Sequence, residues 1–294
     1  MGSNSPEYLS LQPGSGSEGI GWEGESDGPP AGAQSARPDP PRRKPVWLAA
    51  PATHILLAIN CGVWLAMVAK GVSPINPTVD QLMNWGASSA GNVLIEGQWW
   101  RIITAMFLHV GILHLATNMW CLWNLGLLAE PLMGSWGVLA VYILTGAAGN
   151  LLSTLANWLQ YNTTNAFPAG AGASGAVFGI AGALIVLLKS NRLPVPPVEL
   201  KKLRRSVIYF AAINLFIGFS ISIGTAVWGK GLNIDNYAHM GGCACGLLFA
   251  APMVPRLGSP RPAFNLRLRI AVGMIVGILV LFGFFLVQLP PQQN

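Results

Sequence analysis

Charged side chains are scarce in this sequence. Only 10% of its 294 residues are charged, whereas 52% are hydrophobic, and the mean hydropathy is +0.49. Because soluble domains carry about 25% charged residues, this composition excludes an ordinary soluble globular protein. It predicts an integral membrane protein built from apolar helices.

Cysteine is rare as well. The four cysteines lie in apolar stretches, and the two nearest in sequence, Cys243 and Cys245, would point in different directions on a helix. This pattern excludes a disulfide framework and a zinc site. The other two cysteines are Cys61 and Cys121.

Large apolar side chains are few in the first 45 residues, which are rich in Gly, Ser, Pro and acidic residues. Such a segment cannot bury enough surface to fold, so we expect 1–45 to be a disordered N-terminal segment. Because no apolar run occurs near the N-terminus, we expect no cleaved signal peptide.

Apolar runs then follow one another to the end of the chain. Their lengths predict an all-α, polytopic membrane helical bundle. The seven expected spans are 51–69, 104–127, 135–158, 171–189, 206–226, 236–254 and 268–288.

Basic residues are concentrated on one side of these spans. All but three of the 17 Lys and Arg residues lie before the first span, between the fourth and fifth, or between the sixth and seventh. The exceptions are Lys70, Arg101 and Lys230. The positive-inside rule therefore predicts a cytoplasmic N-terminus and an outer C-terminus. The net charge of +6 is thus a topology signal, and we expect no nucleic-acid partner.

Polar residues inside the spans are costly and usually functional. With this topology, Ser174 lies about a turn inside the outer end of its span, and His239 does so in the sixth span. His109 and His114 lie in the outer half of the second span. At about 1.5 Å per residue, these groups from three helices share one layer below the outer surface.

Small residues predict how two of these helices pack. His239 shares a face with Gly242 and Gly246, a GxxxG pair. The fourth span carries Gly172 and Gly175 around Ser174. Close approach of two such helices would let the imidazole of His239 reach the Ser174 hydroxyl.

This set of residues suits acyl transfer. Ser174 would be the nucleophile and His239 its general base. His114 and Asn118, four residues apart on one helix face, would donate hydrogen bonds to an oxyanion. We expect Asp235 in the outer loop and no buried carboxylate beside His239, which favours a Ser-His dyad. Phe178, one turn below Ser174, could pack on the imidazole.

The same residues resemble the rhomboid family of intramembrane serine proteases over residues 50–254. The ordered set of motifs is far more specific than a lone Gly-x-Ser-Gly. The motifs are Trp100-Arg101, His109 and His114 with Asn118, Glu130-x-x-x-Gly134, Gly172-Ala173-Ser174-Gly175, and Ala238-His239-x-Gly241-Gly242-x-x-x-Gly246.

The resemblance implies a nucleophile at Ser174, a base at His239, and an oxyanion hole formed by His114, Asn118 and the backbone N–H of Ser174. It implies cleavage, near the outer face, of single-pass membrane proteins with a helix-destabilised transmembrane segment, without a metal or cofactor. It also implies a six-helix catalytic core at 46–254, followed by a basic linker and seventh helix at 255–294. Some relatives have tyrosine where this chain has Phe178.

Several interpretations stay open at this stage. His109 could bind water near the site or stabilise the first loop, and Arg101 is expected to tie that loop down. Glu130 and Gly134 are expected to order the cytoplasmic end of the second and third spans. The alternatives to a protease are an inactive relative that binds membrane proteins and a small-molecule transporter, although the sequence has no internal repeat. We expect a bacterial inner membrane, with an organelle membrane as the alternative.

Overall fold

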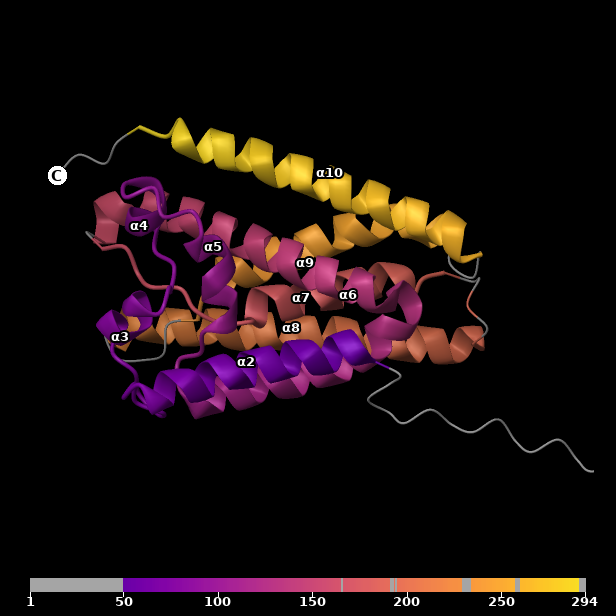
Figure 1. Cartoon of the computed structure of the whole chain (residues 1–294), viewed down its shortest axis with the longest axis horizontal. Helices are drawn as coiled ribbons and strands as arrows, with labels where there is room; N and C mark the ends of the chain where they lie inside the picture. The colour runs from indigo at the N-terminus through magenta and orange to yellow at the C-terminus, as the bar shows by residue number, and fades with distance from the viewer. Residues whose placement is uncertain are drawn as a thin grey trace, which may run out of the picture. The chain divides into compact units, whose positions relative to one another are not determined.

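The described part of the chain is helical. The computed structural model describes residues 50–164, 166–190, 193, 195–228, 234–256 and 260–290, so the prediction for 1–45 lies outside it. In these ranges no strand forms, and one isolated backbone pair joins Ser88 to Gly170. The predicted all-α membrane bundle is confirmed. The helices (Figure 1) are α2 (Pro51–Ala69), α3 (Val79–Asn84), α4 (Ala90–Leu94), α5 (Arg101–Thr104), η1 (Ala105–Phe107), α6 (Ile112–Thr164), α7 (Ser174–Leu187), α8 (Pro197–Trp228), α9 (Asn236–Ala250), η2 (Ala251–Arg256) and α10 (Arg261–Val287).

Four of these helical segments are long and apolar enough to cross a membrane: α2, α6, α9 with its continuation, and α10. The 53-residue α6 is broken at Gly134, whose φ of 74° no helix tolerates. The chain reverses there, so α6 runs out and back through the bundle (Figure 1). Its two halves correspond to the second and third predicted spans.

The second and fourth predicted spans begin too early, and glycine explains both errors. The span 104–127 starts only at Ile112, because Gly111 has a φ of 86° and cannot be helical. The span 171–189 starts only at Ser174, because Gly172 has a φ of 142°. His109 therefore lies in a loop, and Ser174 is the first residue of α7.

The fifth and seventh spans are longer than predicted at their N-terminal ends. α8 begins at Pro197 and α10 at Arg261, several residues before the apolar stretches. Hydropathy alone sets the expected boundary where charges begin, but a helix can continue into water with charged side chains on it. Both extensions carry basic residues.

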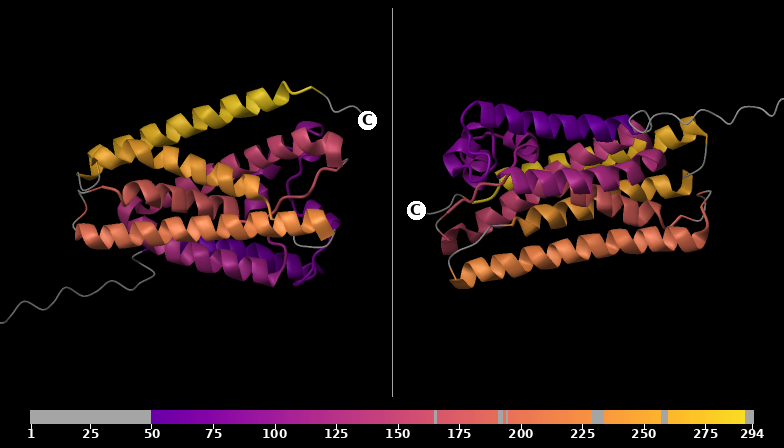
Figure 2. Two further views of the ribbon diagram at one scale, coloured as in Figure 1. Left: turned by 180° about the vertical axis from the view of Figure 1, so that it is seen from behind. Right: turned by 90° about the horizontal axis from the view of Figure 1, so that it is seen from below.

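Backbone contact between helices holds the centre of the bundle together. A side chain at Gly242 would overlap the carbonyl oxygen of Gly175, and one at Gly246 would overlap that of Gly179. α9 also approaches α6, since a Cβ on Gly149 would lie 2.5 Å from the Ala238 carbonyl oxygen. Glycine permits this approach, as is usual between membrane helices. Figure 2 shows α7 enclosed by its neighbours from two further directions.

Glu130 stabilises the N-terminus of α2. Its side chain is 3% exposed and accepts hydrogen bonds from the backbone N–H groups of Ala52 (2.8 Å) and Thr53 (2.9 Å). It also accepts from the hydroxyls of Thr53 and Ser135. Because the Ala50 side chain cannot cap α2, Glu130 supplies both the missing acceptors and a negative charge at the positive helix end.

Arg101 holds the loop between α2 and α6. Its guanidinium donates to the carbonyl oxygens of Met83 (2.7 Å) and Ala87 (2.8 Å), to the Gln98 amide oxygen, and lies 4.6 Å from the centre of the Trp100 ring. At 8% exposure it is one of the few buried charges. Its hydrogen bonds therefore order the backbone of the loop.

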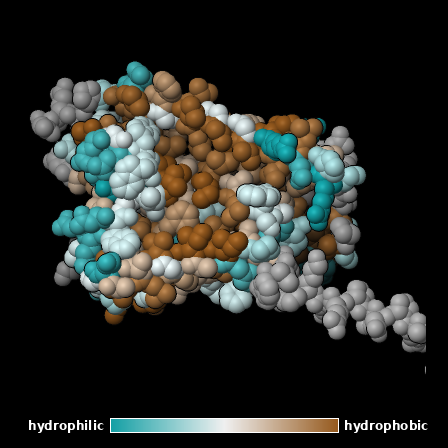
Figure 3. All heavy atoms as spheres, viewed as in Figure 1, coloured by the Kyte–Doolittle hydropathy of each residue, from teal (hydrophilic) through white to brown (hydrophobic). Residues whose placement is uncertain are grey.

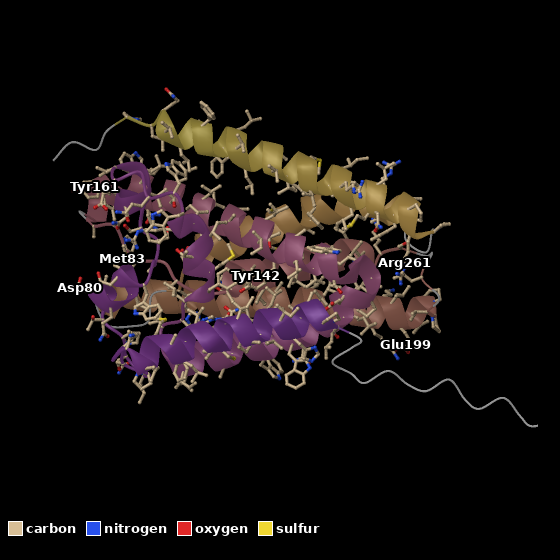
Figure 4. The ribbon with its side chains drawn as sticks, in the orientation of Figure 1. Asp80, Met83, Tyr142, Tyr161, Glu199 and Arg261 are labelled. Atoms are coloured by element: carbon tan, nitrogen blue, oxygen red, sulfur yellow. The ribbon has the colours of Figure 1, made fainter. Side chains whose placement is uncertain are left out.

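Polar residues lie at the two ends of the bundle and apolar residues between them. On the face drawn in Figure 3, hydrophobic residues occupy the middle. Figure 4 labels Asp80, Met83 and Tyr161 at one end, Glu199 and Arg261 at the other, and the buried Tyr142 between them. This distribution matches a protein that crosses a bilayer.

Candidate active site

Ser174 lies at the N-terminus of a short helix. α7 has 14 residues, or about 21 Å at 1.5 Å per residue, against about 30 Å for a bilayer core. A helix this short starts below one membrane surface. Its first backbone N–H groups have no partner within the helix and form the positive end of its dipole. Ser174 therefore stands where a negative charge would be stabilised.

The loop before Ser174 is fixed at three points. Gly172 N–H donates to the Ala105 carbonyl oxygen (2.9 Å), and Gly170 exchanges two backbone hydrogen bonds with Ser88. Phe167 stacks on Tyr161 (ring centroids 4.4 Å apart) and on Trp158 (5.7 Å). Phe167 was not among the residues predicted from the sequence. Two aromatic residues three apart on α6 and a third in the following loop are the signal that could have found it.

His239 lies in the first turn of α9 and is 7% exposed. Its ring stacks on Phe178 with centroids 4.4 Å apart and an interplanar angle of 16°. Phe178 is four residues after Ser174, so the two share a face of α7. A Cβ on Gly175 would lie 3.3 Å from the Ala238 carbonyl oxygen, which shows how near the two first turns are. The structure thus places the imidazole against Phe178, which lies one turn along α7 from Ser174.

His114 faces the same space. Its Nδ1 accepts from the Val110 N–H (3.3 Å), so in the neutral ring the proton sits on Nε2. A Cβ on Gly172 would lie 3.1 Å from this Nε2 and 3.7 Å from Ser174 Oγ. The same Cβ would lie only 2.7 Å from His114 Cε1, so Gly172 lies between the His114 ring and Ser174 and leaves no room for a side chain of its own. We regard the position beside Gly172, between these two side chains, as the candidate position of an oxyanion.

Asn118 lies one turn after His114 on the same helix and is 6% exposed. Its amide nitrogen donates to the His114 carbonyl oxygen (2.9 Å). The Asn118 amide carries a second N–H, so it retains donor capacity beside His114. The structure therefore brings both predicted donors to the same face of α6.

His109 is a buried loop residue. It is 1% exposed, and its ring centroid is 5.3 Å from that of His114. The expectation that His109 lies within the second span is therefore wrong, because the helix begins only at Ile112 and the loop at Gly111 turns His109 toward His114. Burial lowers the pKa of His109 to about 3, with the neighbouring His114 as a second cause. His109 is thus neutral at physiological pH.

Asp235, expected in the outer loop, is the last residue before α9 and forms its N-cap. One carboxylate oxygen accepts from the Ala238 N–H (2.9 Å), and the other accepts from the Ser153 hydroxyl of α6. Burial raises the pKa of this carboxyl. The described hydrogen bonds of the carboxylate do not include one from the His239 ring. An Asp immediately before a helix is a recognisable N-cap signal.

No metal centre accompanies these residues. Within the described ranges, His, Cys, Asp and Glu side chains nowhere gather in groups of three that could hold an ion. The arrangement offers a hydroxyl group, an imidazole and hydrogen-bond donors close to Gly172. Such a constellation suits nucleophilic attack on a carbonyl group.

Comparison with known proteins identifies the family of this chain. Residues 96–256 match the Rhomboid domain family. The chain is 32% identical over 243 residues to "Rhomboid protease GluP" of Bacillus subtilis, and the aligned region covers 82% of this chain and 42% of that protein. It is 30% identical over 213 residues to "Rhomboid protease AarA" of Providencia stuartii, covering 67% of this chain and 70% of that protein.

A plant relative is similar too. "RHOMBOID-like protein 6, mitochondrial" of Arabidopsis thaliana is 33% identical over 186 residues, covering 63% of this chain and 54% of that protein. This chain thus spans less than half of the Bacillus protein and about half of the Arabidopsis one. The family match and the apolar helices make this an integral, multi-pass membrane protein. The chain belongs to the rhomboid family.

Proposed function

We propose that this protein is an intramembrane serine endopeptidase with a Ser174–His239 dyad. The observation that carries the proposal is the stacking of His239 on Phe178, one turn from Ser174 at the N-terminus of α7. Membership of a family in which curated relatives are named proteases supports the same activity.

In the proposed reaction, Ser174 Oγ attacks the carbonyl carbon of a peptide bond while neutral His239 takes the hydroxyl proton. The C–N bond then breaks, and the imidazolium gives its proton to the leaving amine. A water molecule, deprotonated by the same imidazole, hydrolyses the acyl-enzyme and releases Ser174. Stacking on Phe178 would hold the imidazole in place through both steps.

In this proposal, the negative charge that develops on the carbonyl oxygen is stabilised at the position beside Gly172, between His114 and Ser174. The proposed donors are His114 Nε2–H, the free amide N–H of Asn118 and the backbone N–H of Ser174. Loss of one such donor typically lowers the rate by about 100- to 1000-fold. His109 supports this hole by packing beside His114.

A dyad explains the surroundings of His239 better than a triad. The carboxylate nearest to His239 in the sequence is that of Asp235, whose two oxygens accept hydrogen bonds from Ala238 and Ser153. The proposed steps need neither a metal nor a cofactor.

The proposed substrates are membrane proteins with a helix-destabilised transmembrane segment, cut near the outer face. A peptide bond within a regular helix is shielded by its own hydrogen bonds and side chains. Because the short α7 sets Ser174 below the surface, a substrate segment must unwind there to present a carbonyl group. The lipid bilayer is therefore part of the reaction environment.

The proposed setting is a bacterial inner membrane with the N-terminus in the cytoplasm. The basic N-terminal ends of α8 and α10 support this orientation. Glu199 and Arg261, on these two ends, lie on the same side of the bundle in Figure 4. Relatives in a plant make an organelle membrane the alternative.

The test compares purified wild type, Ser174→Ala and His239→Ala on a single-pass reporter with an alanine-containing, helix-destabilised segment. We expect cleavage by the wild type alone. A fluorophosphonate probe should label Ser174 of the wild type and neither variant at a comparable rate. Cleavage that survives Ser174→Ala would refute the mechanism, and an unlabelled, folded wild type would indicate an inactive relative that binds membrane proteins.

A further inference from the structure

Asp235 connects the three segments that form the candidate site. It caps α9, which carries His239, through the hydrogen bond from the Ala238 N–H. It reaches α6 through the Ser153 hydroxyl. It also adjoins the loop before the nucleophile, because its Oδ2 lies 3.6 Å from the point where a Cβ on Gly170 would sit.

Among the described residues, the surroundings of Asp235 are polar and contain no balancing charge. The carboxylate borders a pocket between α4, α6 and the loop before α7, and no other described residue that lines it is titratable. The Ser153 hydroxyl accepts in turn from the Asn157 amide (3.1 Å). The other lining residues are Ser88, Ser89, Ala90, Asn150, Thr154 and Gly170. Asp235 is partly buried, and a partly buried carboxylate that has no ion pair with a described residue is costly, so its presence at this junction calls for a functional explanation.

The position of the cap explains what Asp235 can do. Ala238, whose N–H it accepts, is the residue directly before His239. The His239 N–H itself donates to the Asp235 backbone carbonyl (3.3 Å). The side chain and backbone of one residue therefore set the first turn of α9, and that turn aims the imidazole at α7.

We propose that Asp235 is a positioning residue that, braced by Ser153, holds the first turn of α9 so that His239 faces Ser174. This inference rests on the proposed function, because it assumes that the Ser174–His239 pair is the reacting pair. Asp235 contacts neither reacting atom. Its effect passes through the backbone of Ala238 and His239.

The proposal makes the acceptor, and not the negative charge, the important property. Asparagine caps helices as well as aspartate does and keeps an oxygen for the Ala238 N–H, whereas alanine keeps none. We therefore compare Asp235→Ala, Asp235→Asn and Ser153→Ala. The matched control is Glu130→Gln, which weakens the buried cap at the start of α2, away from the site.

The experiment measures three quantities on the full chain in detergent: the rate of Ser174 labelling by a fluorophosphonate, kcat and KM on the reporter, and the Tm. A misplaced catalytic group can cost about 100-fold in rate. We expect Asp235→Ala to lower the labelling rate and kcat at least about tenfold with little change in KM. Asp235→Asn should restore most of both, and Ser153→Ala should lie between wild type and Asp235→Ala. Glu130→Gln should lower only the Tm.

Two results would overturn the proposal. If Asp235→Ala lowers the Tm as Glu130→Gln does but keeps the wild-type labelling rate, the residue only stabilises the fold. If Asp235→Asn is as slow as Asp235→Ala, the charge matters and positioning does not. Failure of the proposed function looks different, because then the folded wild type itself is not labelled at Ser174.

Discussion

Replacing Gly242 with alanine tests whether backbone contact between α7 and α9 sets the catalytic geometry. The added methyl group would overlap the Gly175 carbonyl oxygen and would also press on the Gly175 backbone. Backbone atoms cannot rotate out of the way as a flexible side chain can. Relief therefore requires α9 to move away from α7 by on the order of 1 Å, a displacement that can lower a catalytic rate about 100-fold.

Because of the position of Gly242, the displacement of α9 would also move His239, the proposed general base. This glycine lies three residues after His239, on the same face of α9, so a shift at Gly242 carries the imidazole away from Ser174. Overpacking of this kind also costs about 1–3 kcal/mol of stability. We expect Gly242→Ala to lose about 100-fold in fluorophosphonate labelling and in kcat, with a reduced Tm.

Gly273→Ala is the matched control, because a Cβ on this α10 glycine would meet nothing within 4 Å. Alanine is favoured over glycine inside a helix by about 1 kcal/mol, so this variant should keep wild-type activity and a Tm at or above that of the wild type. The reasoning would be refuted if Gly242→Ala matched Gly273→Ala in labelling rate and Tm. In that case α9 would tolerate a side chain at its closest approach to α7.

Three further predictions concern other residues. Glu130→Gln removes the charge that caps α2, so thermal unfolding should show a loss of about 1–3 kcal/mol; an unchanged Tm would show that the charge is not needed. Phe178→Ala should slow fluorophosphonate labelling by removing the ring under His239, whereas Phe178→Tyr should preserve it; equal labelling of both variants would contradict the role of stacking. Burial raises the pKa of the Asp235 carboxyl above its ordinary value of 3.8, so on raising the pH the unfolded chain ionises first and the wild type loses stability relative to Asp235→Asn. Tm measurements on both proteins, from below pH 3.8 upward, should show that the Tm of Asp235→Asn minus the Tm of the wild type grows and then levels off. A rise in the Tm of the wild type relative to that of Asp235→Asn would contradict the prediction.

Sequence patterns predicted the helices well and their starts poorly. The predicted span 51–69 coincides with α2, because a proline stands at its start and the apolar run ends at Lys70. The errors at Ile112 and Ser174 share one cause, since Gly111 and Gly172 adopt positive φ values inside apolar sequence. Hydropathy cannot detect such a stop, because it scores side chains and not backbone angles.

The residues of the candidate site were identifiable, but most of their contacts were not. Spacing alone put His114 and Asn118 on one face, and the hydrogen bond between them agrees. The stacking of His239 on Phe178 was one open possibility. The roles of Asp235 and Phe167 stayed hidden, because their partners Ser153, Trp158 and Tyr161 lie on another helix or before a turn. Local patterns carry no information about which residues such a fold brings together.

The amino-acid sequence by itself determined that this is a helical membrane protein of the rhomboid family, because composition, apolar run length and ordered motifs depend only on the order of residues. Only the tertiary structure decided that Ser174 begins α7, that Gly172 lies between His114 and the serine, and that the Asp235 side chain joins α9 to α6. These features depend on backbone angles at single glycines and on contacts between residues up to 82 positions apart. Such contacts form only when the helices have packed, and therefore no local pattern in the chain records them.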